Sequence, residues 1–324
     1  MTTTLQTQKN LPTHQMVCTS DEDYIAVVGA RTRTWDISLG GVKRGFLSDK
    51  GNQYMFINQG LLQLQLFPQP LPNYKRQRIL VVFQHGYTAT DIQRINNYTY
   101  DLNARIVYVK TVEELTAFLN NRIHKKRAVK QLIFFSHGII GKISLRYEGD
   151  EESSGEFSSA TVDKIKKDIF HYDAQLISYA CRTGIGVNGE SFKNSAEAQP
   201  ENSLAQYMAN KWLIEIRAFE RRSLYAKTYG TNAEIKEARN AKKMIEEYNQ
   251  KNNLYKQGKM KNKPQKPHNY DLLKSRFDSV TTRDKNADGD DGPIMPLGAW
   301  HLPTSGATPT GLKNGLQVYR YKKK

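Results

Sequence analysis

Two apolar runs of this sequence each end in a reactive side chain: Gln131-Leu-Ile-Phe-Phe-Ser-His137-Gly138 and Ala174-Gln-Leu-Ile-Ser-Tyr-Ala-Cys181-Arg-Thr-Gly184. Short continuous apolar runs bounded by turn residues are typical of buried parallel strands. In open α/β sheets the functional groups lie just beyond the carboxyl ends of such strands. If these two strands are neighbours, at a spacing of roughly 4.8 Å, His137 and Cys181 emerge side by side at one edge of the sheet.

An imidazole beside a thiol is the minimal equipment for covalent acyl transfer. The imidazole can accept the thiol proton and later donate a proton to the leaving amine. Gly138 leaves its backbone N–H unobstructed near an oxyanion, where such a donor contributes about 2.7–4 kcal/mol. Taken alone, Cys181 could be a core cysteine and His137 a strand-capping histidine. We favour catalysis because both occur at matching ends of matching strands.

Two short motifs carry a family resemblance. Ser136-His-Gly138 and Tyr179-Ala-Cys-Arg-Thr-Gly184 resemble the His-Gly and Ala-Cys-Arg-Gly blocks of caspase-like (clan CD) cysteine peptidases, which include caspases, metacaspases, gingipains, clostripain and separase. The resemblance covers about residues 77–230, and the spacing from His137 to Cys181 is close to the roughly 50 residues of caspases. It implies that His137 is the general base and acid, Cys181 the nucleophile and Gly138 an oxyanion donor.

Further residues are candidates for substrate binding. Caspases have Gln, and metacaspase-like members Asp, at the position of Tyr179, so the preferred residue before the scissile bond stays open. Arg182 follows the nucleophile directly. His85-Gly86 repeats the His-Gly pattern after the apolar run 78–84. In the caspase-like sheet order that strand lies beside the one ending in His137, so His85 would line the same cleft, or act as the base if the topology differs.

No cofactor or metal is expected. His85, His137 and Cys181 are suitable zinc ligands, but no local paired-ligand spacing supports a zinc site. The stretch 284–290 matches the first half of a calcium loop, yet Met295 stands where a bidentate Glu belongs, so a polar turn is favoured. We interpret Cys18 as incidental.

The cysteine content and the lack of long apolar segments indicate where in the cell the protein is found. The two cysteines, Cys18 and Cys181, argue against a disulfide framework and fit a reducing environment. The sequence has no apolar run of transmembrane length, and its first residues lack the apolar stretch of a signal peptide. We therefore expect a cytoplasmic protein, or one exported by a dedicated secretion system.

The predicted fold class is α/β, with a caspase-like, mostly parallel sheet flanked by helices. Residues 1–75 are expected to form an N-terminal β-rich extension of unknown role, with a disordered leader and strands over 23–28, 53–58 and 61–67. Residues 76–230 are expected to form the catalytic domain, with strands over 78–84, 104–109 and 213–219, the last being the fifth of its sheet. The capping-box pattern at Thr111 predicts the start of a helix, 160–172 is expected to be a helix, and 148–159 a loop. Residues 231–292 form a basic helical insertion and linker, and 293–324 complete the fold, with Tyr319 in a returning strand.

The formal net charge is +16, and much of the excess lies between residues 236 and 276. A solvated helical insertion is the favoured interpretation of this charge. The spacing over 233–257 predicts an amphipathic helix that packs on the core or on a partner, and a protein partner could bind through the 233–276 region. Nucleic acid is considered unlikely because aromatic residues are sparse there. A flexible segment over 256–268 is a candidate for self-cleavage.

The expected activity is that of a cysteine endopeptidase that acts on a protein or peptide substrate through a thioester. Two alternatives remain open. The chain could be a catalytically inactive caspase-like adaptor that binds a partner through the 233–276 region. It could also be a thiol hydrolase or acyltransferase acting on a non-peptide ester; the absence of a Gly-x-Ser-x-Gly motif weighs against a serine enzyme.

Overall fold

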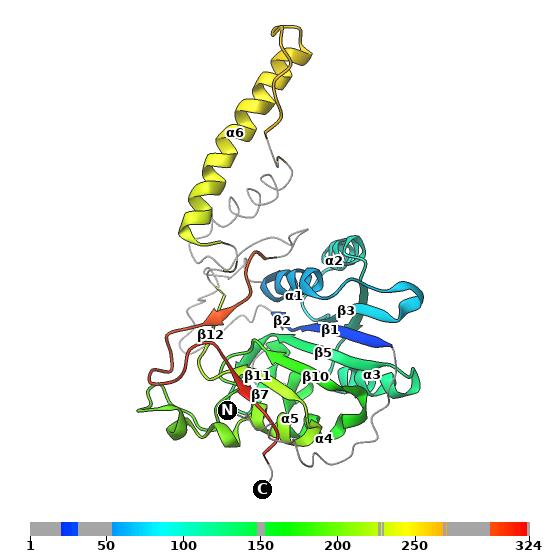
Figure 1. The fold of residues 1–324 in the computed structure, drawn as a ribbon, viewed down its shortest axis with the longest axis vertical. Coiled ribbons are helices and arrows are strands. Elements are labelled where there is room, and N and C mark those ends of the chain that lie inside the picture. The colour runs from blue at the N-terminus through cyan, green and yellow to red at the C-terminus, as the bar shows by residue number, and fades with distance from the viewer. Residues whose placement is uncertain are drawn as a thin grey trace, which may run out of the picture.

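The computed structural model describes residues 21–31, 54–147, 153–225, 228, 230–267, 270 and 299–322. Its centre is a seven-stranded sheet in the order β14-β11-β10-β5-β1-β3-β4 (Figure 1). All neighbours pair in parallel except β14, which is antiparallel to β11. The strands are β1 (Glu22–Val28), β3 (Arg76–Phe83), β4 (Arg105–Val109), β5 (Ala128–Phe135), β10 (Phe170–Ser178), β11 (Glu215–Phe219) and β14 (Leu316–Tyr319). The α/β class with a mostly parallel sheet is therefore confirmed.

Helices cover both faces of this sheet (Figure 1). On one side lie α1 (Met55–Leu66) and α2 (Ala89–Asp101), and on the other α3 (Val112–His124), α4 (Ser159–Lys164) and α5 (Leu204–Trp212). Successive residues of β1 alternate between the two cores: Ile25 and Val27 pack with α3 and α5, whereas Ala26 and Val28 pack with α1. This double burial explains why the strands are continuous apolar runs in the sequence.

Smaller sheets and short helices lie outside the seven-stranded sheet. Three minor sheets pair β2 (Ala30–Arg31) with β8 (Arg146–Tyr147), β12 (Ser223–Leu224) with β13 (Thr304–Ser305), and β7 (Lys142–Ser144) with both β6 (His137–Ile139) and β9 (Glu156–Ser158). Short 3-10 helices are η2 (Pro72–Tyr74), η3 (Ser153–Gly155), η4 (Lys167–Ile169), η5 (Ser195–Ala198) and η6 (Pro200–Asn202). The long helix α6 (Asn232–Lys256) stands away from the body.

The expected N-terminal β-rich extension is not found among the described residues. The strand predicted at 23–28 exists as β1, but it lies inside the main sheet, between β3 and β5. The strands predicted at 53–58 and 61–67 are wrong, because residues 55–66 form α1. Leu61 and Leu64, which looked like part of an alternating strand, also have helical spacing, and both are fully buried. Gly60 lets α1 approach the sheet, since a methyl group there would lie 2.6 Å from Leu80 Cδ1.

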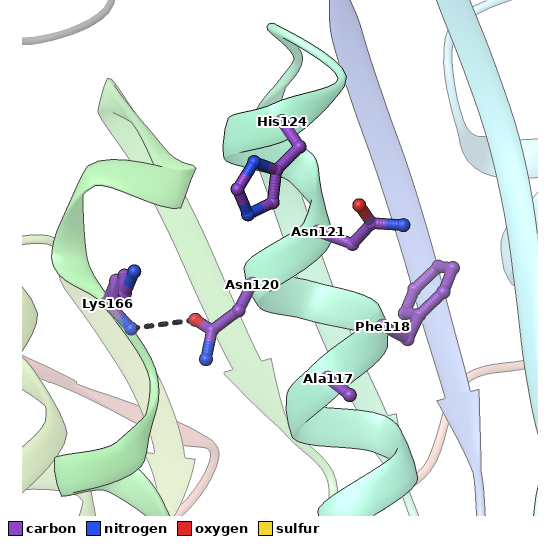
Figure 2. Close-up of a pocket in the computed structure, with 6 residues that line it drawn as sticks. All are labelled: Ala117, Phe118, Asn120, Asn121, His124 and Lys166. Carbon is purple, nitrogen blue, oxygen red and sulfur yellow. Dashed lines mark hydrogen bonds between the residues drawn. The ribbon is translucent and has the colours of Figure 1, made fainter.

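The helix predicted over 160–172 is only partly present. The backbone leaves α4 at Ile165, which has an extended conformation, and β10 begins at Phe170. A side chain of α3 explains this early end: the Asn120 amide donates to the Lys164 carbonyl (2.9 Å), and its oxygen accepts the Lys166 N–H (2.9 Å; Figure 2). Asn120 thus bonds backbone groups that a longer helix would have paired internally. The loop predicted over 148–159 contains β9 at its end.

Other predicted elements are confirmed. The strands expected at 78–84, 104–109 and 213–219 are β3, β4 and β11, and Tyr319 lies in the expected returning strand, β14. The helix expected at 233–257 is α6, and Thr111 caps α3 by accepting the Glu114 N–H. The predicted disordered leader, Cys18 and the incomplete calcium loop at 284–290 lie outside the described residues.

A buried charge cluster ties the amino edge of the sheet together. Asp23 of β1 is fully buried and bonds two arginines, Arg122 Nη1 at 3.0 Å and Arg127 Nε at 2.7 Å. Arg127 also bonds Asp21 (3.1 Å), and Arg122 lies 4.1 Å from the centre of the Phe118 ring. Breaking such a pair leaves a buried charge without compensation. The cluster therefore locks β1 to α3 and to the start of β5.

We predict that Asp23→Ala lowers the free energy of unfolding by about 3–5 kcal/mol, because two guanidinium groups lose their buried carboxylate. Urea denaturation monitored by circular dichroism measures the loss. Asp173→Ala is the matched control: Asp173 bonds Lys130, but its side chain is 46% exposed, so the loss should stay below about 1 kcal/mol. Equal losses for the two variants would contradict the role of the cluster.

Candidate active site

The two sequence motifs lie at the carboxyl ends of neighbouring strands. β5 and β10 pair in parallel, with Leu132 opposite Leu176 and Phe134 opposite Ser178. The pairing continues past the strands, since the Tyr179 N–H donates to the Phe134 carbonyl at 2.9 Å. The chain therefore leaves the sheet toward His137 and toward Cys181 at the same edge. The predicted adjacency of these two strands is confirmed.

Gly138 touches the backbone of the cysteine residue directly. A methyl group at Gly138 would lie 2.4 Å from the Cys181 carbonyl oxygen and 2.8 Å from its nitrogen, so only glycine fits. The β6–β7 hairpin, which begins at His137, thus packs on the Cys181 segment. The half-buried His137 ring packs edge-on against Phe56 of α1, with ring centres 5.0 Å apart. Phe56 in turn contacts Tyr225, so an aromatic wall supports the imidazole.

The Cys181 sulfur is half-buried and free of any disulfide. It lies 3.3 Å from the backbone nitrogen of Ser223, which donates to it, and 3.1 Å from the Ser223 hydroxyl. Sequence reasoning missed Ser223. The available signal was its place in a polar run, Glu220-Arg-Arg-Ser223, that follows the fifth predicted strand of the sheet and so lies at the same carboxyl edge. The Ser223 N–H is positioned to stabilise negative charge on the sulfur.

Two arginines and one glutamate form a clamp next to Cys181. Arg222 holds Glu190 with both terminal nitrogens, each at 2.5 Å, and bonds the Thr308 hydroxyl at 2.7 Å. Hydrogen bonds from Arg222 keep the pKa of Glu190 below its usual value. Arg182, a predicted substrate-binding residue, lies 3.7 Å from Glu190 and bonds Asn188. In this structure Arg182 therefore engages its own loop.

His85 does not follow the strand next to that of His137. β1 lies between β3 and β5, so the strands leading to His85 and His137 are second neighbours, roughly 10 Å apart. This corrects the expected sheet order. The sequences of β3 and β5 do not show that β1, from the N-terminal part of the chain, pairs between them. His85 is half-buried, and its Nε2 lies 3.3 Å from Arg146 Nη2 of β8.

Tyr179 is a core residue, which corrects its expected place in a substrate pocket. Only 5% of its surface is exposed. Its ring stacks on Phe135, with centres 4.9 Å apart and planes within 5°, and meets Phe219 edge-on. Side chains alternate along β10 and its extension, so the residue two places before Cys181 points into the α1 core. Burial raises the pKa of Tyr179 to about 12.

A separate cavity of about 470 Å³ lies beside α3, lined by Ala117, Phe118, Asn120, Asn121, His124 and Lys166 (Figure 2). None of its lining residues belongs to the segments around Cys181. Among the residues that the structure describes, no group of three or more His, Cys, Asp and Glu side chains could hold a metal ion. No helix in that same part of the chain is long and apolar enough to cross a membrane.

Comparison with known proteins assigns no family. A scan against protein-family models found no match, and a search of the curated proteins found none either. The geometry of the residues around Cys181 therefore carries the functional argument.

The burial of Tyr179 predicts a pH dependence of stability. The unfolded chain releases the phenol proton near pH 10.0, whereas the folded chain holds it to about pH 12. Folding therefore loses stability as the pH rises from 10 toward 12, by about 1.4 kcal/mol per pH unit from this residue. Urea denaturation at pH 9, 10 and 11 should show a smaller decline for Tyr179→Phe than for wild type. Tyr100→Phe, which alters a ring that is 83% exposed, is the control. An identical decline in wild type and Tyr179→Phe would contradict the prediction.

Proposed function

We propose that this chain is a caspase-like cysteine endopeptidase in which Cys181 is the nucleophile and His137 the general base and acid. The observation that carries the proposal is the packing of the His137–Gly138 segment on the Cys181 backbone, at the carboxyl ends of two neighbouring parallel strands. The short motifs that resemble caspase-like peptidases thus lie where such chemistry needs them. The antiparallel β14 at the end of a parallel sheet is compatible with the same fold.

The reaction proceeds in two balanced steps. His137 takes the thiol proton of Cys181, and the sulfur attacks the carbonyl carbon of the scissile peptide bond. Gly138 N–H stabilises the resulting oxyanion. The C–N bond then breaks as the imidazolium gives its proton to the departing amine, which leaves a thioester on Cys181. In the second step His137 accepts a proton from a water molecule as the water oxygen attacks the thioester carbonyl. The C–S bond then breaks, the acid leaves, and the imidazolium returns its proton to the Cys181 sulfur.

The Ser223 contacts support this role for Cys181. A backbone N–H aimed at the sulfur can stabilise the charge that develops when His137 removes the proton. A structural cysteine in an apolar core stays a neutral thiol, so a hydrogen-bond donor beside its sulfur would not be needed for its packing role. The clamp of Arg222 and Glu190 fixes the loops on either side of the sulfur, and so holds the nucleophile in place.

Two other functions remain candidates. A thiol hydrolase or acyltransferase acting on a non-peptide ester would use the same residues, and peptide hydrolysis distinguishes it from a peptidase. An inactive adaptor would bind a partner through the 233–276 region; the projection of α6 away from the body favours such a binding role. Reactivity of the thiol separates the adaptor from both enzymes.

The direct test is alkylation of Cys181 by iodoacetamide at pH 7, followed by peptide mass spectrometry. We predict that folded wild type reacts at least about tenfold faster at Cys181 than the urea-unfolded chain, because a neighbouring base and a hydrogen-bond donor activate the sulfur. His137→Ala should remove most of that advantage, whereas His124→Ala, which alters an exposed histidine beside the α3 cavity, should leave it intact. A rate that His137→Ala does not change would contradict the dyad.

Self-processing is a second consequence of the proposal. The candidate segment 256–268 follows α6, and its described residues are mostly exposed, as a cleavage site requires. We predict that intact mass spectrometry of wild type finds two fragments that remain associated through the β11–β14 pairing, and that Cys181→Ala stays whole. If both proteins stay whole under conditions where wild type cleaves added peptides, self-processing is excluded.

A further inference from the structure

Thr228 and the pair Trp300–His301, which lie on opposite sides of α6 in the sequence, meet at one place on the body. The backbone nitrogens of Trp300 and His301 both donate to the Thr228 carbonyl, at 2.8 and 3.0 Å. The His301 ring bonds Glu234 in the first turn of α6 at 2.8 Å. From this closed base α6 extends over 25 residues, or ~37 Å, away from the sheet (Figure 1). We call residues 232–267 the arm, and residues 248–267, at its far end, the tip.

Positive charge is concentrated at the tip. The base of the helix, residues 232–247, carries four basic and four acidic residues and is formally neutral. The tip carries six lysines and no acidic residue. Those lysines are Lys251, Lys256, Lys259, Lys261, Lys263 and Lys266. The arm therefore places its charge at the end farthest from the body, where an external partner can reach it.

The tip lysines are available to bind an anion outside the chain. All six are exposed. Five of them, Lys251, Lys256, Lys259, Lys261 and Lys263, have no salt-bridge partner within the described part of the chain. The chain reverses at Gly258, whose positive φ of 71° suits glycine, so lysines from the helix and from the returning segment share one end of the arm. Tyr270 holds the returning segment to α6 by packing on Tyr248 and donating to Asn249 at 3.0 Å.

We propose that the tip binds the phosphate backbone of double-stranded nucleic acid, without sequence preference. Besides lysines it carries seven amide side chains, which donate hydrogen bonds to phosphate oxygens. They are Asn249, Gln250, Asn252, Asn253, Gln257, Asn262 and Gln265. The sparse aromatic residues that spoke against nucleic acid in the sequence bear on single strands, which bind by base stacking, and not on a duplex backbone.

An anionic bilayer fits the tip less well. Helices that bind a membrane surface bury an apolar face in it. At the tip, the exposed large apolar side chains among the described residues are Leu254 and Tyr255, at 38% and 37%. The many amides beside them would lose water on entering the interface. The tip therefore suits a hydrated phosphate chain better than a lipid surface.

The test is fluorescence anisotropy with a labelled 20-base-pair DNA duplex of mixed sequence, using the full chain between about 50 and 200 mM salt. We expect the logarithm of the binding constant to fall steeply with the logarithm of salt concentration. Lys256→Gln, Lys259→Gln and Lys261→Gln combined should make that slope shallower by about 3, because each lost phosphate contact removes about 0.9. The same variants should weaken binding equally for unrelated duplex sequences.

The control removes the same charge from the body. Lys110→Gln, Lys125→Gln and Lys167→Gln combined change three exposed lysines outside the arm and should leave the slope as in wild type. Equal effects of the two triple variants would show a general charge effect and overturn the proposal. So would the absence of duplex binding at 50 mM salt, or tip-dependent binding to phosphatidylserine vesicles without binding to duplex. None of these readouts involves Cys181, so they test the arm independently of the proposed peptidase activity.

Discussion

The parallel pairing of β5 with β10 is the constraint on which the candidate site depends. It brings the carboxyl ends of two strands, about forty residues apart in the sequence, next to each other at one end of the sheet. A slip of one residue would move every side chain of a strand to the opposite face, and the close packing of the two cores opposes that exchange. Gly138 completes the arrangement, because its missing side chain lets the hairpin after β5 rest on the Cys181 backbone.

The same edge also collects segments from the last third of the chain. Ser223 of β12 contacts the Cys181 sulfur, while the other edge of β12 pairs with β13. Arg222 joins this strand to Glu190 on one side and Thr308 on the other. α6 begins a few residues after β12 in the sequence. The strand that contacts the Cys181 sulfur therefore also leads into the projecting helix. A partner bound at the tip would lie at the far end of α6, ~37 Å along the helix from this edge.

Sequence patterns predicted the elements that obey local rules. The continuous apolar runs of β3, β5 and β10 are real strands, and the last two are neighbours, which was the condition for bringing His137 and Cys181 to the same end of the sheet. Failures occurred where distant contacts override local pattern. Leu62, Leu64 and Leu66 alternate as in a strand, whereas Leu61 and Leu64 are three residues apart as in a helix, and packing of these two on the sheet selects the helix. The insertion of β1 between β3 and β5 depends on long-range pairing, which no local motif records. The contact from Ser223 to Cys181 uses a backbone N–H, a group that nearly every residue carries, so composition could not reveal it.

The most direct test of the central claim is capture of the covalent intermediate. Wild-type protein would be mixed with a peptide library, quenched in acid within the first turnover, and analysed by intact and peptide mass spectrometry. The account predicts a thioester on Cys181 whose added mass equals the acyl half of a cleaved peptide, and no such adduct or cleavage with Cys181→Ala. Peptide cleavage that persists in Cys181→Ala, or a folded wild type that forms no adduct and cleaves no peptide, would contradict it.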